Sequence, residues 1–208
     1  MNPRPPGQVR IIAGHLRGSK LPVPDRPGLR PSADRVRETL FNWLQPMLPG
    51  ARVLDLFAGT GALGFEACSR GARATTLVER DPGLAEGLRD SARRLKVEGL
   101  RVVTADALSW LQQDPGERFD LVFLDPPFEA GLWEEAARRL GPWLASDAWI
   151  YVETPLKTAL LLPSGWRLHR EGQTREVRYA LFRSGNGAAP ETAATIASEP
   201  NPQVTPSA

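Results

Sequence analysis

Residues 125–128 of the chain combine an acid, two prolines and an aromatic ring directly after the apolar run 120–124. The tetrapeptide is Asp125-Pro126-Pro127-Phe128. Each proline fixes its own φ angle and disfavours helix at the residue before it, so the acid and the ring are held in one arrangement. The carboxylate can accept hydrogen bonds from an exocyclic amino group, while the phenyl ring stacks on the planar ring that carries this group. The pattern suits a methyltransferase acting on a planar amine, although a proline-rich turn alone would also explain it.

A second motif, residues 53–64, runs from an apolar stretch through a glycine-rich turn into a predicted helix at about 62–70. Its glycines, Gly59, Gly61 and Gly64, permit a tight turn and a close approach of the backbone to a ligand. Such a turn, placed after a strand and before a helix, is typical of dinucleotide sites. It equally suits S-adenosylmethionine, so the glycines do not decide between the two ligands.

Acidic residues around the glycine motif favour S-adenosylmethionine. Asp55 precedes the turn, where a carboxylate suits the cationic amino-acid end of this cofactor and would repel a pyrophosphate. Glu79 follows the apolar run 74–78 and can bind ribose hydroxyls with either ligand. Asp106 follows the run 100–104 and is placed to meet the adenine amino group. The predicted cofactor-binding residues are Asp55, Phe57, Gly59, Gly61, Glu79 and Asp106.

Acids at positions 55, 79, 106 and 125 each follow a predicted strand of one α/β unit. Any one of them could instead cap a helix or lie in a loop. Ligands of such sheets bind at the carboxyl ends of the strands, so four acids in series predict one shared crevice.

The composition of the 208-residue chain excludes several classes of protein. No apolar run approaches the roughly 18 residues of a membrane helix, and the N-terminus lacks the apolar segment of a secretory signal. A single cysteine, Cys68, excludes an intramolecular disulfide and a cysteine-rich metal site, and the two histidines are far apart in the sequence. We therefore expect a cytoplasmic protein with no metal site.

Positive charge is concentrated near the N-terminus. Residues 1–40 carry eight Lys or Arg against three acids, within a chain of net charge +2. A positively charged segment of this kind can bind the negatively charged phosphate backbone of a nucleic acid. Residues 9–50 are therefore predicted to form an RNA-binding extension. Some of the arginines could instead pair with Asp34 or Glu38, which lie within helical reach. The candidate RNA contacts are Arg10, Arg17, Lys20, Arg30, Arg35 and Arg37.

The N-terminal extension is predicted to contain a small β-hairpin and a helix. Two β-like runs, 9–13 and 19–23, flank a basic turn, and the helix begins after Ser32 as N-cap and reaches about Leu48. Apolar residues at positions 36, 40, 43, 44 and 47 form one stripe of this helix, which should pack on the following domain.

Residues 51–184 are predicted to form the catalytic domain, in which strands and helices alternate as in a doubly wound parallel sheet. The later elements are a helix at 132–144, a strand at 148–153 and a hairpin of two runs, 166–172 and 175–182. The predicted fold class is α/β. Within this class we predict the Rossmann-like fold of class I S-adenosylmethionine methyltransferases. This fold would have a mostly parallel seven-stranded sheet with an antiparallel C-terminal hairpin, and the chain adds a small N-terminal β-hairpin and helix.

Both ends of the chain are predicted to be disordered. Residues 1–8 show no periodicity, and residues 185–208 contain four prolines and no Lys, Arg or aromatic residue.

The segments 9–21 and 29–44, together with residues 55–64 and 125–128, resemble the bacterial 16S rRNA guanine-N2 methyltransferases of the RsmD type. The resemblance covers about residues 9 to 183, and its N-terminal signature is more specific than the catalytic tetrapeptide. Two departures are visible: the residue at 13 is Ala where the family usually has a glycine, and Ser at 19 replaces a frequent Arg or Lys. The second departure removes one candidate phosphate contact.

The resemblance implies S-adenosylmethionine-dependent methylation of the exocyclic N2 of one guanine, usually numbered 966, in 16S rRNA. The implied partner is the small ribosomal subunit or its late assembly intermediate, with no membrane partner, and the enzyme is expected to be a monomer. The implied catalytic residues are Asp125, Pro126, Pro127 and Phe128.

Three other functions remain open. A DNA or RNA adenine-N6 methyltransferase shares the Asp-Pro-Pro-aromatic site, but the DNA enzymes normally carry a recognition domain for which this chain has no candidate segment. A protein glutamine methyltransferase prefers Asn at the position of Asp125. A non-catalytic ribosome-assembly factor with a vestigial cofactor pocket is disfavoured by the intact Gly59, Gly61 and Asp125.

Overall fold

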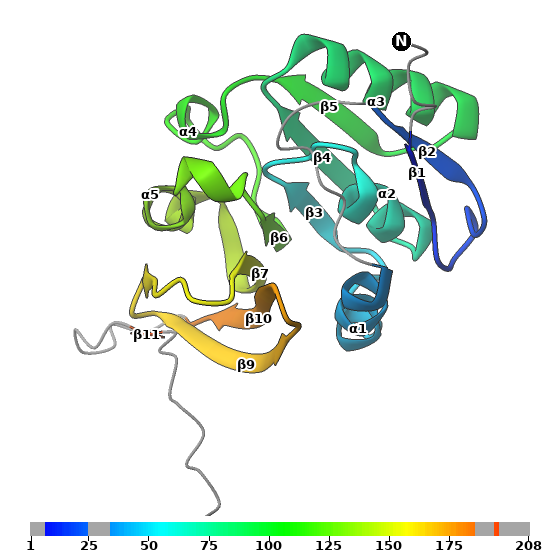
Figure 1. Cartoon of the computed structure of the whole chain (residues 1–208). Coiled ribbons are helices and arrows are strands. Elements are labelled where there is room, and N and C mark those ends of the chain that lie inside the picture. Colours follow the sequence, from blue (N-terminus) through cyan, green and yellow to red (C-terminus); the bar gives the residue numbers. More distant parts are fainter. Residues whose placement is uncertain (1–6, 25–33, 186–193, 196–208) are drawn as a thin grey trace, which may run out of the picture.

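The computed structural model describes residues 7–24, 34–185 and 194–195, and its core is a seven-stranded sheet. In sheet order the strands are β5 Leu100–Thr104, β4 Ala74–Glu79, β3 Arg52–Asp55, β6 Phe119–Leu124, β7 Leu144–Pro155, β10 Val177–Ser184 and β9 Trp166–Gln173. The strands from β5 to β7 are parallel, whereas β10 is antiparallel to both β7 and β9. The predicted mostly parallel sheet with an antiparallel C-terminal hairpin is therefore confirmed (Figure 1).

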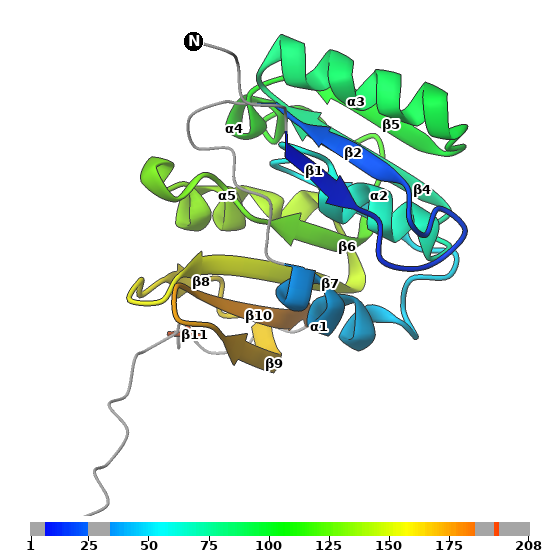
Figure 2. The ribbon, with the colours of Figure 1, turned by 45° about the vertical axis from the view of Figure 1, so that its right-hand side comes forward.

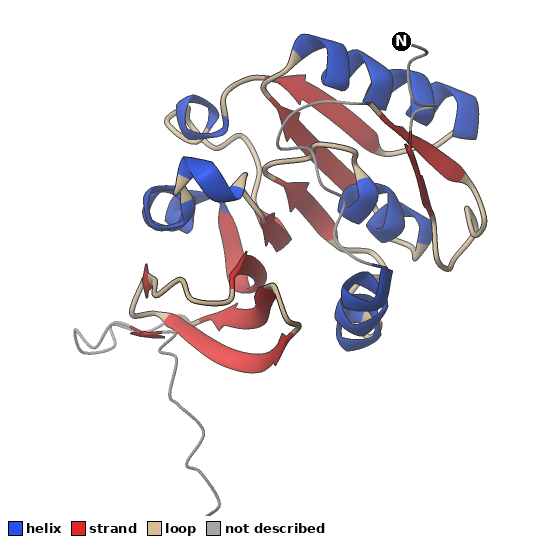
Figure 3. Cartoon of the chain, in the orientation of Figure 1, coloured by secondary structure: helices blue, strands red, loops and turns tan. Residues whose placement is uncertain are grey.

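Helices cover both faces of this sheet (Figure 3). They are α1 Asp34–Leu44, α2 Ala62–Ser69, α3 Pro82–Leu95, α4 Ala107–Trp110 and α5 Trp133–Leu140, with 3-10 turns η1 Phe128–Ala130 and η2 Gly141–Trp143. Helices α1 and α2 share an apolar cluster with one face of β3, β6, β7 and β10. Helices α4 and α5 pack against the opposite face of β6, β7 and β10. Because both of its faces are buried, β6 is apolar at successive positions rather than at alternate ones.

The N-terminal hairpin consists of β1 Gly7–Arg10 and β2 Lys20–Val23, which pair antiparallel. The prediction of a hairpin is confirmed, but its first strand lies earlier in the chain than the predicted run 9–13. Gly7 pairs with Val23, and residues 11–19 form the turn. The prediction that residues 7 and 8 are disordered is wrong because their backbone groups find partners in β2, and residues 1–6 lie outside the described chain.

Helix α1 ends at Leu44, before the predicted end at Leu48. Pro46 explains the early end, because a proline lacks the N–H that a helix needs and disfavours helix at the residue before it. The predicted N-cap, Ser32, lies outside the described residues. The apolar stripe packs on the domain as predicted, and Phe41 is a further, fully buried member.

The later elements differ from the prediction mainly at their ends. Strand β7 begins at Leu144 rather than at 148, because the preceding helix α5 ends at Leu140, two residues before Pro142. The closing hairpin turns at residues 174–176, where the Thr174 N–H donates to the carbonyl of Val177 at 2.8 Å.

Part of the C-terminal tail is ordered. Strand β11 Ala194–Thr195 pairs antiparallel with β8 Leu161–Leu162. The prediction of disorder is wrong for these two tail residues, since an exposed strand edge can bind any extended segment through its backbone groups. Residues 186–193 and 196–208 lie outside the described chain.

Among the helices that the structure describes, none is long and apolar enough to cross a membrane. The same described ranges contain no group of three or more His, Cys, Asp or Glu side chains arranged to hold a metal ion.

Candidate active site

The glycine turn between β3 and α2 surrounds a buried acid. Asp55 is only 3% exposed, and its Oδ2 accepts a hydrogen bond from the backbone N–H of Gly64 at 3.0 Å. Burial raises the pKa of this carboxyl from 3.8 to about 7, the Gly64 hydrogen bond lowers it, and repulsion from Glu79 raises it further. A carboxyl in this setting gains from a cationic partner, because an ion pair would favour its charged form.

Glu79, at the end of β4, holds the glycine turn in place. Its Oε2 accepts from the N–H of Gly59 at 2.9 Å, and its Oε1 accepts from the N–H of Asp81 at 2.8 Å. The residue therefore has a structural role that the sequence did not reveal. A carboxylate has about four acceptor sites, so these two bonds leave capacity for ribose hydroxyls.

The glycines of the turn serve the protein's own packing. Gly61 has a φ angle of 75°, and a Cβ added there would meet the Leu88 side chain at 2.6 Å. A Cβ at Gly64 would meet the Leu77 side chain at 2.2 Å. At both positions the missing side chain makes room for a neighbouring apolar residue, and the close approach of a ligand to the backbone stays a prediction. Gly59, with a φ of 50°, supplies the left-handed turn itself.

Asp106 and Phe57 complete the predicted cofactor set. Asp106 is exposed at the end of β5 and is the N-cap of α4, where its Oδ1 accepts from the N–H and the hydroxyl of Ser109. Asp106 therefore caps a helix, which was the alternative to a role in binding adenine, and that binding role stays a prediction. Phe57 is half-buried and packs against the cluster on the α4 and α5 face. The acids at positions 55, 79, 106 and 125 all stand at the carboxyl edge of the sheet, as predicted.

The tetrapeptide after β6 lies at the same edge of the sheet. Asp125 is half-buried and Pro126 is buried, whereas Pro127 is exposed. Phe128 begins the turn η1 and is 37% exposed, an unusual state for a large apolar side chain, with its ring centroid 6.0 Å from that of Trp133. An aromatic ring supported from behind and open in front can stack on a planar ligand.

Two residues of β7 that the sequence analysis missed lie beside this tetrapeptide. The Tyr151 hydroxyl is fully buried and donates to Oε2 of Glu153 at 2.6 Å. The pKa of Tyr151 is raised well above 10.0 by burial, by the charge of Glu153 and by the charge of Asp125. The alternation of Tyr151 and Glu153 along a predicted strand was the available signal, because it places both side chains on one face.

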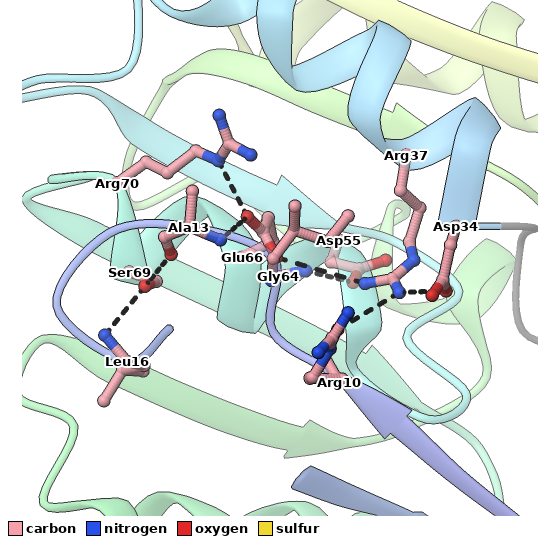
Figure 4. Close-up of polar contacts among 11 residues, drawn as sticks. Arg10, Ala13, Leu16, Asp34, Arg37, Asp55, Gly64, Glu66, Ser69 and Arg70 are labelled. Atoms are coloured by element: carbon pink, nitrogen blue, oxygen red, sulfur yellow. Dashed lines mark hydrogen bonds and ion pairs between the residues drawn. The ribbon is translucent and has the colours of Figure 1, made fainter. Parts of the chain in front are cut away.

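The N-terminal hairpin lies beside α2 (Figure 2) and is fixed to it by buried polar contacts (Figure 4). Both carboxylate oxygens of Glu66 accept backbone N–H groups of the hairpin turn, from Ile12 at 2.7 Å and Ala13 at 3.0 Å. The Ser69 hydroxyl accepts from the N–H of Leu16 at 2.9 Å and donates to the carbonyl of Ala13 at 2.5 Å. The hairpin turn is therefore held by α2, the helix that follows the glycine turn.

Arg37 joins the hairpin to α1 and is completely buried. Its Nη2 donates to the carbonyl of Arg10 at 3.2 Å and to Asp34 at 2.6 Å, and its Nη1 lies 4.0 Å from Glu66 (Figure 4). The prediction that Arg37 contacts RNA is wrong because its charge is used inside the protein, in part through the local pairing with Asp34 that the sequence had left open. Arg10, Arg17, Lys20 and Arg35 are exposed, and Arg30 lies outside the described residues.

The comparisons with known proteins agree with this arrangement. A family model described as Conserved hypothetical protein 95 matches residues 9–183. The "Ribosomal RNA small subunit methyltransferase D" of Escherichia coli K12 is 50% identical over 180 residues, which cover 85% of this chain and 90% of that protein. Its namesake in Haemophilus influenzae is 46% identical over 187 residues, covering 88% and 97%. A solved structure, "Putative methyltransferase yhhF from Escherichia coli", is 47% identical to this chain and superposes with a TM-score of 0.81. The match covers 87% of this chain and 100% of that protein.

Proposed function

Because this chain belongs to the Conserved hypothetical protein 95 family, with relatives named small-subunit rRNA methyltransferases, we propose that it methylates 16S rRNA in the small ribosomal subunit. The proposed reaction transfers the methyl group of S-adenosylmethionine to the exocyclic N2 of one guanine, numbered 966. The observation that carries the proposal is the juxtaposition of Asp125-Pro126-Pro127-Phe128 with the glycine turn at one edge of the sheet. Because small ribosomal subunits are cytoplasmic in bacteria, the proposed substrate implies a cytoplasmic enzyme.

The residues around the glycine turn fit S-adenosylmethionine. The cofactor carries a cationic amino-acid end, and the buried Asp55 carboxyl supplies a partner whose ionisation that cation would favour. Glu79 accepts the ribose hydroxyls, Asp106 accepts from the adenine amino group, and Phe57 packs beside the adenosine. When bound, the cofactor supplies an electrophilic methyl group.

The tetrapeptide holds and prepares the target amine. The lone pair of guanine N2 is delocalised into the base, so this nitrogen is a poor nucleophile. Hydrogen bonds from the amino group to Asp125 and to a strand-end carbonyl such as that of Pro126 favour the tetrahedral geometry that in-line attack requires. Phe128 stacks on the flipped base, and Pro127 fixes the direction of the chain between Pro126 and Phe128. Positioning of the two reactants then supplies most of the acceleration. The methylated nitrogen is strongly acidic, so water takes its proton.

Residues 9–50 form the proposed RNA-binding extension of the catalytic domain 51–184. The exposed Arg10, Arg17, Lys20 and Arg35, together with Arg30, contact the phosphate backbone around the target. Because Glu66 and Ser69 fix the hairpin turn to α2, the hairpin cations Arg10, Arg17 and Lys20 keep a constant position relative to the glycine turn.

The test is transfer of labelled methyl from S-adenosylmethionine to small subunits that lack the modification, followed by nuclease digestion and nucleoside analysis. The proposal expects N2-methylguanosine at one site. Formation of N6-methyladenosine would show that the target base is adenine and not guanine. Absence of label from a protein that binds the cofactor would favour a ribosome-assembly factor without activity.

A further inference from the structure

The carboxyl edge of the sheet has a cofactor half and a target half. The proposed cofactor contacts follow β3, β4 and β5, whereas β6 ends in the tetrapeptide that holds the target base. Beyond β6 come β7, β10 and β9, in that order. Neighbouring strands lie about 4.8 Å apart, so the start of β10 lies on the order of 10 Å from the end of β6. The loops of β7 and β10 are therefore within reach of the nucleotides next to the target base.

The loop after β7 and the turn before β10 present two cations at this edge. The two strands pair antiparallel, and beyond their last pair the Leu156 N–H donates to the carbonyl of Glu176 at 3.0 Å. The next residue on each segment is a cation, Lys157 after β7 and Arg175 before β10, and both are exposed. The backbone pairing thus brings two positively charged side chains to one corner of the sheet.

In the part of the chain that the structure describes, neither Lys157 nor Arg175 forms an ion pair, whereas Arg178 on β10 pairs with Glu171 at 3.6 Å. Glu176 is the only acid in the two loops. Like charges at opposing positions of paired segments repel each other, so this arrangement is unfavourable for the protein alone. A phosphate group bound between the two cations would remove the repulsion, because it accepts hydrogen bonds from both.

The N-terminal hairpin lies over the cofactor half. Its turn is bound to α2, and the Lys20 carbonyl on its second strand accepts from Nη2 of Arg94 on α3 at 2.7 Å. Helices α2 and α3 contact β3, β4 and β5. Figures 1 and 2 show this hairpin and the β9–β10 pair at opposite ends of the sheet. The hairpin cations and the two loop cations are therefore on opposite sides of the tetrapeptide.

We propose that Lys157 and Arg175 form a second RNA contact, which binds backbone phosphates on the side of the target nucleotide that faces away from the hairpin. This inference rests on the proposed rRNA substrate and adds a contact outside the N-terminal extension. Phosphate contacts set the position of a nucleic acid without reading its sequence. Contacts on both sides of the target fix the backbone at two points, so that the nucleotide between them is flipped toward Phe128.

The first test is the salt dependence of binding to small subunits that lack the modification. The double variant Lys157→Gln/Arg175→Gln removes both charges and keeps two polar side chains. Its affinity should be lower than that of wild type, and the slope of log affinity against log salt concentration should fall by about 1.4 to 1.8, the effect of two lost phosphate contacts. Its melting temperature and its affinity for S-adenosylmethionine should be unchanged, because both side chains are exposed and neither belongs to the cofactor half.

A matched control removes two exposed arginines from the opposite edge of the sheet. Arg73 directly precedes β4 and Arg118 directly precedes β6, so both lie at the amino edge. The variant Arg73→Gln/Arg118→Gln has the same net charge as the test variant and should keep the wild-type slope. An equal fall of the slope in both variants would show an effect of net charge alone and would contradict the second contact.

The second test identifies the partner by photo-crosslinking. Benzoylphenylalanine in place of Lys157 should crosslink the enzyme to 16S rRNA close to the methylated guanine. A crosslink to a ribosomal protein, or to rRNA far from this guanine, would show that the corner has another partner and would overturn the inference.

The outcomes separate this inference from the proposed function. A Lys157→Gln/Arg175→Gln enzyme with the wild-type salt slope would remove the second contact, while methylation by the wild type would still support the rRNA substrate. A wild-type enzyme that methylates no guanine in the small subunit would instead overturn the proposed function.

Discussion

Binding of S-adenosylmethionine should release a proton from Asp55. This carboxyl is buried beside Glu79, and its pKa is about 7, so it is about 90% protonated at pH 6. An ion pair with the cationic amino-acid end of the cofactor favours the ionised form and lowers the pKa. About 0.9 proton should therefore leave the protein per cofactor bound at pH 6, and about 0.5 at pH 7.

The same ionisation makes cofactor affinity depend on pH. From pH 5 to pH 7 the ionised fraction of Asp55 rises from about 1% to about 50%, so the affinity should increase on the order of 50-fold. Titration calorimetry in buffers of different ionisation enthalpy measures both the affinity and the released proton. In Asp55→Asn the side-chain oxygen can still accept from Gly64, but proton release and pH dependence should both disappear.

Asp55 should also destabilise the cofactor-free protein as pH rises. Its folded pKa is above its value of 3.8, so its contribution to stability is fully present below pH 3.8 and is lost as pH rises through 7. The loss is on the order of 4 kcal/mol, since one pKa unit corresponds to about 1.4 kcal/mol. Denaturation of wild type and Asp55→Asn across this range measures it. The control variant Glu98→Gln, which removes an exposed acid in the loop between α3 and β5, should behave as the wild type does. A wild-type protein that binds the cofactor without releasing a proton at pH 6 would contradict the pairing of Asp55 with the cationic end of the cofactor.

Three further predictions concern the tetrapeptide and the hairpin. Phe128→Ala should lower kcat/KM for small subunits roughly 10- to 100-fold through lost stacking, with Phe128→Tyr near wild type and cofactor affinity unchanged in both, as steady-state kinetics and calorimetry would report. Glu66→Gln should lower the free energy of unfolding by about 3 kcal/mol in chemical denaturation, because it removes the buried negative charge 4.0 Å from Nη1 of Arg37 and leaves only Asp34 to pair with this guanidinium, and an unchanged value would contradict the anchoring role. Arg17→Ala should weaken subunit binding and reduce the slope of log affinity against log salt concentration by about 0.7 to 0.9, and a slope equal to that of wild type would remove Arg17 from the RNA contacts.

The sheet and the tetrapeptide were predictable because local patterns encode them. Apolar runs that end in Asp55, Glu79 and Asp125 mark the strands and their carboxyl ends, and a parallel sheet brings those ends to one edge. The end of α1 was also encoded, in Pro46, but the apolar stripe beyond it suggested a longer helix.

The partners of buried charges were not predictable from the sequence. Arg37 lies in a basic segment and has the pattern of a surface residue, yet Glu66, 29 positions later, makes it part of the interior. The alternation of Tyr151 and Glu153 shows that they share one face of their strand, but no local pattern specifies the register that brings them beside the end of β6. Gly61 and Gly64 fit a ligand-binding motif, while Leu88 and Leu77 are the groups that require them to lack a side chain.

The most direct test of the account compares wild type with Asp125→Ala on small subunits that lack the modification, with cofactor binding measured by calorimetry on the same preparations. We expect one N2-methylguanosine per 16S rRNA with the wild type. We expect none with Asp125→Ala, which should bind S-adenosylmethionine with wild-type affinity. An Asp125→Ala enzyme that still forms N2-methylguanosine at a rate close to that of wild type would contradict the assignment of this site.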